Sequence, residues 1–200
     1  MGRSPWGVSS GQGGFIESLS GSFNNALLIS IVDFGATTTA HVAQAGRELG
    51  AQVRRLVGAG ATHILVTGAY NMGRSPWGIS TGQAAFIETL TASFNNALLI
   101  SIVDFGSTTL YVDAALFFNL VTANPTVYSL ADVTNPICTS VDPGPGIGIG
   151  AGQVNSALCN ASTLQALAPS TTLFADPVYF TPIGNALFGN YAADRLRARF

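Results

Sequence analysis

The stretch Thr172-Leu173-Phe174-Ala175-Asp176-Pro177-Val178-Tyr179-Phe180-Thr181-Pro182 joins a short apolar run to a segment that favours a helix. Residues 172–174 have the apolar, β-branched composition of a buried strand. Asp176 and Pro177 are typical turn residues. Pro182 suits the first turn of a helix, and the pattern up to Arg197 predicts a closing amphipathic helix. The stretch therefore predicts a strand, a turn and a helix in direct succession.

Upstream of this stretch, helical and strand patterns alternate along the chain. Apolar β-branched runs of four to six residues indicate buried parallel strands. The helix over 83–98 is expected to bury Phe86, Leu90, Phe94 and Ala97 on one face. The span 126–168 is expected to be mostly loop. This alternation predicts an α/β fold with helices on both faces of a parallel sheet. The remaining predicted strands are 62–67 and 109–112, and the remaining helices 38–56 and 113–121.

An internal repeat dominates the first half of the chain. Residues 1–37 match residues 72–108. At every position that differs, the side chain of the second copy has one more heavy atom, as where Ala84 corresponds to Gly13. Only two copies exist, which argues against a solenoid. Both copies have the same apolar pattern, so we expect them to compete for one position beside the strand at Ile64. We expect residues 79–98 to hold it, and the first copy to cover the opposite side of the sheet or to dock on a neighbouring chain as a swapped element in a homodimer.

The composition narrows the classes of partner. Apolar residues make up 48% of the chain and charged residues only 9%, with a net charge of −2. All eight basic residues are Arg and form no basic run, so nucleic acid is not an expected partner. No run reaches the roughly 20 apolar residues of a spanning helix, and no signal peptide is expected within residues 1–15. Neither a cofactor nor a metal site is expected, because the histidines and cysteines lack ligand spacing.

The two cysteines, Cys138 and Cys159, flank a loop rich in Gly and Pro. A disulfide between them would close this loop, and a pair of buried free thiols is the alternative. Disulfides persist in oxidising compartments. The cysteine pair, the low charge and the absence of Lys together favour a secreted or periplasmic protein.

Several segments, taken in their order, resemble the SGNH/GDSL serine esterases and lipases, closest to the secreted and autotransporter-associated phospholipase and esterase branch. The final segment, with Asp176 and a Thr-Pro pair, resembles the last signature block of that family. The resemblance implies a three-layer α/β/α, flavodoxin-like fold and an acyl ester or lipid substrate. It also supports the disulfide. The other matching segments are 52–66, 71–76, 94–98, 111–113 and 124–128, followed by Cys138.

The resemblance also implies which site residues to examine. In the family, an Asp and a His three residues later serve a serine nucleophile, and here these positions are Asp176 and Tyr179. A tyrosine has an unperturbed pKa of about 10 and is a donor more readily than a base at neutral pH. The family's nucleophile block precedes the part equivalent to Thr38, where this chain has the first repeat copy. Ser107 is interpreted as a loop serine, His41 as an exposed helix residue and His63 as the start of a strand.

These observations lead to two functional hypotheses. The chain is expected to be an SGNH/GDSL-type carboxylic ester hydrolase, or a fragment of one, impaired by Tyr179 and by the missing serine block. The alternative is a non-catalytic SGNH-like module that binds a partner or lipid. Under both hypotheses, the chain would consist of a duplicated segment over 1–37 and an SGNH-like domain over 38–200 that is incomplete at its N-terminal side. Asp176 and Tyr179 are expected at the mouth of a cleft at the carboxyl edge of the sheet, without a Ser–His pair beside them.

Overall fold

The computed structural model describes residues 38–144, 146–166 and 170–200, which form a mixed α/β arrangement. The α-helices are α2 Thr38–Gly58, α3 Pro76–Ser80, α4 Ala84–Ile102, α5 Ala114–Ala123 and α6 Pro182–Arg199. The strands are β1 Ile64–Thr67, β2 Thr109–Val112, β3 Asp132–Pro136, β4 Val141–Asp142, β5 Gln153–Val154 and β6 Thr172–Phe174. The short 3-10 helices are η1 Met72–Arg74, η2 Val103–Phe105, η3 Pro125–Tyr128, η4 Ser156–Leu158 and η5 Ala161–Thr163.

The strands pair two by two in the described part of the chain. β1 is parallel to β2, with Ile64 opposite Thr109, and β3 is parallel to β6. β4 and β5 form an antiparallel pair. The predicted parallel pairing is therefore present, but in short two-stranded pieces. The register of β3 against β6 shifts between Asp132 and Pro136, which interrupts that ladder. The span expected to be mostly loop, 126–168, also contains β3, β4, β5 and three 3-10 helices.

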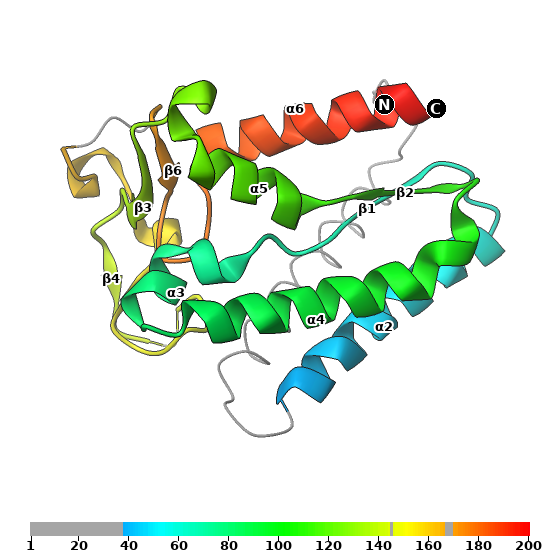
Figure 1. Cartoon of the computed structure of the whole chain (residues 1–200). Coiled ribbons are helices and arrows are strands. Elements are labelled where there is room, and N and C mark those ends of the chain that lie inside the picture. Colours follow the sequence, from blue (N-terminus) through cyan, green and yellow to red (C-terminus); the bar gives the residue numbers. More distant parts are fainter. Residues whose placement is uncertain (1–37, 145, 167–169) are drawn as a thin grey trace, which may run out of the picture.

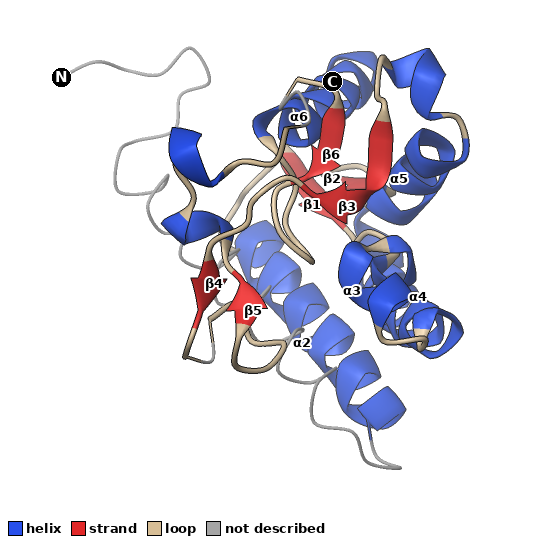
Figure 2. Ribbon diagram, turned by 90° about the vertical axis from the view of Figure 1, so that its left-hand side faces the viewer, coloured by secondary structure: helices blue, strands red, loops and turns tan. Residues whose placement is uncertain are grey.

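Helices lie on both sides of the β1–β2 pair (Figure 1). α5 and α6 lie on one side and α2 and α4 on the other, and the view turned by 90° keeps this order (Figure 2). Two apolar clusters fill the space between them. One joins α2 and α4 to β1, and the other joins α5 and α6 to β6. This arrangement follows from strands that are apolar on both faces, because each face must be covered.

α4 is the central helix of the first cluster. Its buried positions include Ile87, Leu90, Phe94 and Leu98, and the same cluster contains Ile64 of β1. The expectation that the second repeat copy packs beside the strand at Ile64 is therefore confirmed. The first copy lies outside the described residues.

The buried face of α4 differs from the predicted one by about one residue. Phe86 is 40% exposed, and Ile87 is fully buried in its place. Ala97 is partly buried, while Leu98 is fully buried. The spacing of Ile87, Leu90, Phe94 and Leu98 places these side chains on one stripe, and neighbouring residues on a helix differ by about 100°. Apolar residues also stand on both sides of this stripe, so the sequence pattern did not identify which of them are buried.

The second cluster is largely aromatic. The rings of Phe118 and Phe180 stack with centroids 4.0 Å apart, and those of Phe117 and Tyr191 stack at 4.6 Å. Such ring pairs add to the stabilisation from burial alone. Because Phe180 directly follows the turn at Asp176, this cluster anchors the C-terminal side of that turn.

One helical stretch in the described residues, Ala84–Phe105, is long and apolar enough to cross a membrane by length and composition. It comprises α4 and η2, and the inner face of α4 packs against α2. Core helices of globular proteins pass the same criterion.

Asn95 of α4 fixes the chain just after β1. Its Oδ1 accepts a hydrogen bond from the Ala69 amide at 2.8 Å, and its Nδ2 donates to the Ala69 carbonyl at 2.8 Å. Asn95→Ala leaves both groups without this partner, so we expect the free energy of unfolding to fall by about 2 kcal/mol. Urea denaturation measures this change. The neighbouring Asn96 is exposed, and Asn96→Ala is the matched control, with an expected change within about 0.5 kcal/mol. Equal effects of the two substitutions would contradict the assignment.

Candidate functional site

Asp176 lies in the turn between β6 and α6 and is fully buried. Its Oδ1 accepts hydrogen bonds from the amides of Val178 at 2.9 Å and Tyr179 at 2.7 Å. Its Oδ2 accepts from the Ser156 amide at 3.1 Å. A buried carboxylate needs such donors, because an unpaired one is costly to desolvate. The side chain therefore fixes the turn and ties it to the η4 segment.

Backbone hydrogen bonds make the turn rigid. The Ala175 amide donates to the Tyr179 carbonyl at 2.8 Å, which closes the turn around Asp176. The Trp77 amide donates to the Pro177 carbonyl at 3.0 Å and joins the turn to α3. The first hydrogen bond stabilises the turn itself, and the second fixes its position against α3.

Thr181 fixes the start of α6. It is the N-cap residue, and its side chain accepts a hydrogen bond from the Gly184 amide at 3.3 Å. The same hydroxyl donates to the Thr172 carbonyl at 2.7 Å. Pro182 follows as the first helical residue, as the sequence predicts. The strand, turn and helix thus form one hydrogen-bonded unit.

Tyr179 occupies the third position after Asp176 and is partly buried against the α2–α4–β1 cluster. Burial raises the pKa of its phenol, and the negative charge of Asp176 raises it further. The phenol therefore stays protonated at neutral pH. In this state its O–H donates hydrogen bonds and does not serve as a general base.

Tyr70 is a site residue that the sequence analysis missed. Its Oη donates a hydrogen bond to the Val178 carbonyl at 2.6 Å. Burial is the main cause that raises the pKa of this phenol; hydrogen bonding with Ser75 lowers it, and Asp176 and Tyr179 raise it. Its position three residues after β1 was the available signal, because parallel strands bring their carboxyl ends to one edge.

The hydroxyl of Ser75 is already engaged. Its Oγ donates to the Met72 carbonyl at 2.7 Å and accepts from the Gly78 amide at 3.1 Å, which caps α3. Ser75 is fully buried. The loop after β1 and the turn after β6 therefore bring together two tyrosines, a capping serine and a carboxylate.

The histidines lie elsewhere. His41 is exposed on α2, as expected. His63 is also exposed and precedes β1, which begins at Ile64. Its ring lies 2.9 Å from Thr62 Oγ1, and its centroid is 4.5 Å from that of Phe200. Among the residues that the structure describes, no hydrogen bond joins a serine hydroxyl to an imidazole.

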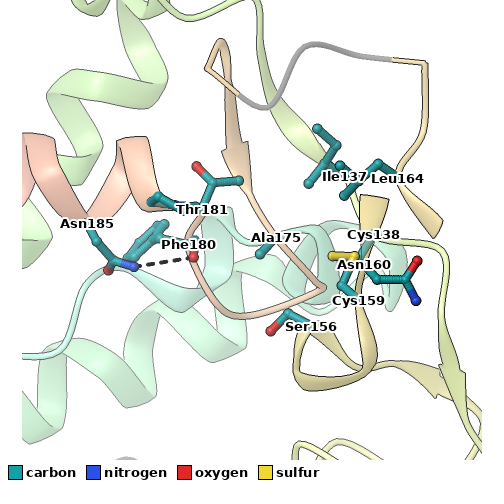
Figure 3. A pocket seen from close by; sticks show the side chains of 11 residues that line it. Ile137, Cys138, Ser156, Cys159, Asn160, Leu164, Ala175, Phe180, Thr181 and Asn185 are labelled. Carbon is teal, nitrogen blue, oxygen red and sulfur yellow. Dashed lines mark hydrogen bonds between the residues drawn. A yellow bond between two sulfur atoms is a disulfide. The ribbon is translucent and has the colours of Figure 1, made fainter. Parts of the chain in front are cut away.

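A shallow cleft of about 450 Å³ lies beside the turn (Figure 3). Neither Asp176 nor Tyr179 lines it. The Asp176 carboxylate accepts from three amides and Tyr179 packs against the α2–α4–β1 cluster, whereas Ala175 and Phe180 line the cleft. The expected position of Asp176 and Tyr179 at a cleft mouth is thus not found at this cleft. No charged side chain lines it. The other lining residues are Ile137, Cys138, Ser156, Cys159, Asn160, Leu164, Thr181, Pro182 and Asn185.

A disulfide joins Cys138 and Cys159, as predicted, and forms part of the cleft wall. The two Cα atoms are 5.8 Å apart. The closed loop contains Ser156, whose amide binds Asp176. The described residues contain no group of three or more His, Cys, Asp or Glu that could hold a metal ion.

No protein-family model matches this chain, and a search of curated proteins gave no match.

Proposed function

We propose that the chain derives from SGNH/GDSL-type carboxylic ester hydrolases and that its ester hydrolysis is impaired by the missing serine block and by Tyr179. The observation that carries this proposal is the Asp176–Tyr179 turn between an apolar strand and a helix capped by Thr181. The resemblance places the acid and the base of the family at these two positions. The parallel pairs and the helices on both sides of β1–β2 are compatible with the three-layer fold that the resemblance implies.

The impairment follows from the chemistry of acyl transfer. The reaction needs a hydroxyl nucleophile, a base that takes its proton, and donors for the oxyanion. Tyr179 has a pKa raised by burial and by Asp176, so it holds its proton at neutral pH. The Asp176 carboxylate accepts its three hydrogen bonds from backbone amides. These hydrogen bonds therefore support the turn whichever side chain stands at position 179.

The second candidate is a non-catalytic module that binds a neutral acyl ester or a lipid. The cleft beside the turn favours it, because its walls combine apolar side chains with hydroxyl and amide groups and carry no charge. Ligand sites commonly combine apolar walls with a few polar groups.

We also propose that the protein resides in an oxidising compartment, as a secreted or periplasmic protein. The Cys138–Cys159 disulfide supports this location, since disulfides persist mainly in such compartments.

Tyr179→His tests the proposed lineage. The wild-type protein is expected to hydrolyse p-nitrophenyl butyrate no faster than buffer and to escape labelling by a fluorophosphonate. Tyr179→His supplies the base, which contributes about 100-fold or more. The rate should rise by this factor, with labelling of a serine, if a serine of this chain takes the place of the missing serine block. Tyr179→Phe is the matched control and should leave the rate at background.

Two outcomes would redirect the proposal. Phosphonate-sensitive turnover by the wild-type protein would show that Tyr179 does not impair catalysis. A folded Tyr179→His protein with neither turnover nor labelling would favour the non-catalytic module.

A further inference from the structure

The face of α2 that receives α4 selects for small residues on the incoming helix. A Cβ atom at Gly46 would lie 2.5 Å from the Phe94 carbonyl oxygen and 3.1 Å from Ala97 Cβ. A Cβ atom at Gly50 would lie 2.3 Å from Ser101 Cβ. The two helices thus approach closely enough that only a helix with small residues at the positions of Ala97 and Ser101 fits this face.

Residues 13–31 have the sequence that this face requires. They align with α4 in the internal repeat, and Ala26 and Ser30 stand where α4 has Ala97 and Ser101. The residues of the apolar stripe are identical too: Ile16, Leu19, Phe23, Leu27 and Ile31 correspond to Ile87, Leu90, Phe94, Leu98 and Ile102.

The differences between the copies avoid the contact surface. Of the positions in the second copy that differ, 79, 81, 85, 89, 92 and 107 are exposed and Ala84 is partly buried. Thr91 is the buried exception, and its hydroxyl donates to the Ile87 carbonyl of its own helix. Ser20 retains the hydroxyl and lacks one methyl group. Divergence has therefore kept every apolar residue of the buried stripe in both copies.

From these observations we propose that the α2 face is a docking site with two alternative occupants in the same chain, α4 and residues 13–31. α2 and α4 run parallel, since Ser93 Oγ lies 3.5 Å from the Thr39 carbonyl oxygen and Arg54 lies over the Phe105 ring. A helix in the α4 position that ends at Ile31 must therefore connect back to Thr38.

The connection is long enough for the exchange. The residue of α4 equivalent to Ile31 is Ile102, nine residues beyond Ser93. That offset corresponds to about 14 Å along the helix and, with a helix separation of about 9 Å, to a span of about 17 Å. Residues 32–37 provide seven Cα–Cα steps, which reach about 24 Å.

α4 occupies the α2 face in the described structure. The sequences of the two copies also predict that α4 is the more stable helix of the two. Gly13, Gly14 and Gly21 stand where the second copy has Ala84, Ala85 and Ala92. Each glycine costs about 1 kcal/mol relative to alanine in a helix. Residues 13–31 are therefore the weaker occupant and take the site when α4 is displaced.

A pair of leucine substitutions tests the redundancy. Ser101→Leu places a large side chain against Gly50 and blocks α4, and Ser30→Leu is its counterpart in the first copy. Ser30→Leu alone should leave Tm unchanged, because α4 holds the site. Ser101→Leu forces the exchange to the weaker copy and should lower Tm by about 6–12 °C, and adding Gly13→Ala, Gly14→Ala and Gly21→Ala should recover this loss. A Ser101→Leu loss that the three alanine substitutions leave unchanged would overturn the proposal.

Cysteine trapping identifies the occupant directly. In the Ser101→Leu protein, Thr39→Cys and Ser22→Cys should form a disulfide within one chain under mild oxidation. Thr39→Cys with Ser93→Cys, without the leucine, is the positive control for α4. Absence of the 39–22 bridge would overturn the proposal, and a bridge found only in cross-linked dimers would overturn its same-chain form in favour of a swapped homodimer.

Discussion

Asp176→Ala is expected to lower the free energy of unfolding by about 4 kcal/mol, because it leaves three backbone amides without their acceptor. These amides belong to Val178, Tyr179 and Ser156, and the carboxylate that serves them is fully buried. Water does not reach this carboxylate, so solvent replaces its hydrogen bonds poorly. Urea denaturation followed by circular dichroism measures the loss, with an unchanged m-value.

Asp176→Asn is the matched control for this prediction. The amide oxygen retains the bonds to Val178 and Tyr179, while the NH2 group faces the Ser156 amide and forfeits that bond. The expected loss is about 1–2 kcal/mol, at most half of that for alanine. A stability of Asp176→Ala within 1 kcal/mol of the wild type would contradict the structural role of the carboxylate.

The second large effect concerns the disulfide. Replacing Cys138 and Cys159 together by alanine should lower the free energy of unfolding by about 3 kcal/mol, since the bridge restricts the unfolded chain. The bridge closes a loop with a sequence separation of 21 residues. Differential scanning calorimetry should show this as a Tm lower by about 6–12 °C.

Reduction supplies the control for the disulfide prediction. Dithiothreitol should lower the Tm of the wild-type protein to that of the double alanine variant and leave the variant itself unchanged. The loop presents the Ser156 amide to Asp176, so combining the cysteine and Asp176→Ala changes should give less than the sum of their losses. Additive losses would show that the loop keeps its position without the bridge.

The Asp176 carboxylate has a structural role in this turn. In the proposed lineage, an Asp at this position orients a base, and in this chain its oxygens bind only backbone amides among the described contacts. The protonated phenol of Tyr179 lies beside this turn. Under the proposed function, the turn is retained while the general base is replaced by Tyr179, and Tyr179→His tests this.

The sequence by itself determined the order and type of the long helices and of β1, β2 and β6, but not the short strands β3, β4 and β5 within 126–168. β2 at Thr109–Val112 and β6 at Thr172–Phe174 have the predicted bounds, and α6 begins at the predicted Pro182. These features depend on local signals, namely apolar runs, turn residues and caps, whose physical effect acts within a few residues. For the cysteine pair, the sequence left a disulfide and two free thiols as alternatives, and the structure contains the disulfide.

The tertiary structure alone decided which polar groups meet. Tyr70 and Val178 are joined by a hydrogen bond across 108 positions of the sequence, and Asp176 binds the amide of Ser156 across 20. It also decided which stripe of α4 is buried, since apolar residues surround that helix on several sides. Local periodicity carries no information about such contacts, because hydrogen bonds and close helix packing depend on how distant elements approach one another in space.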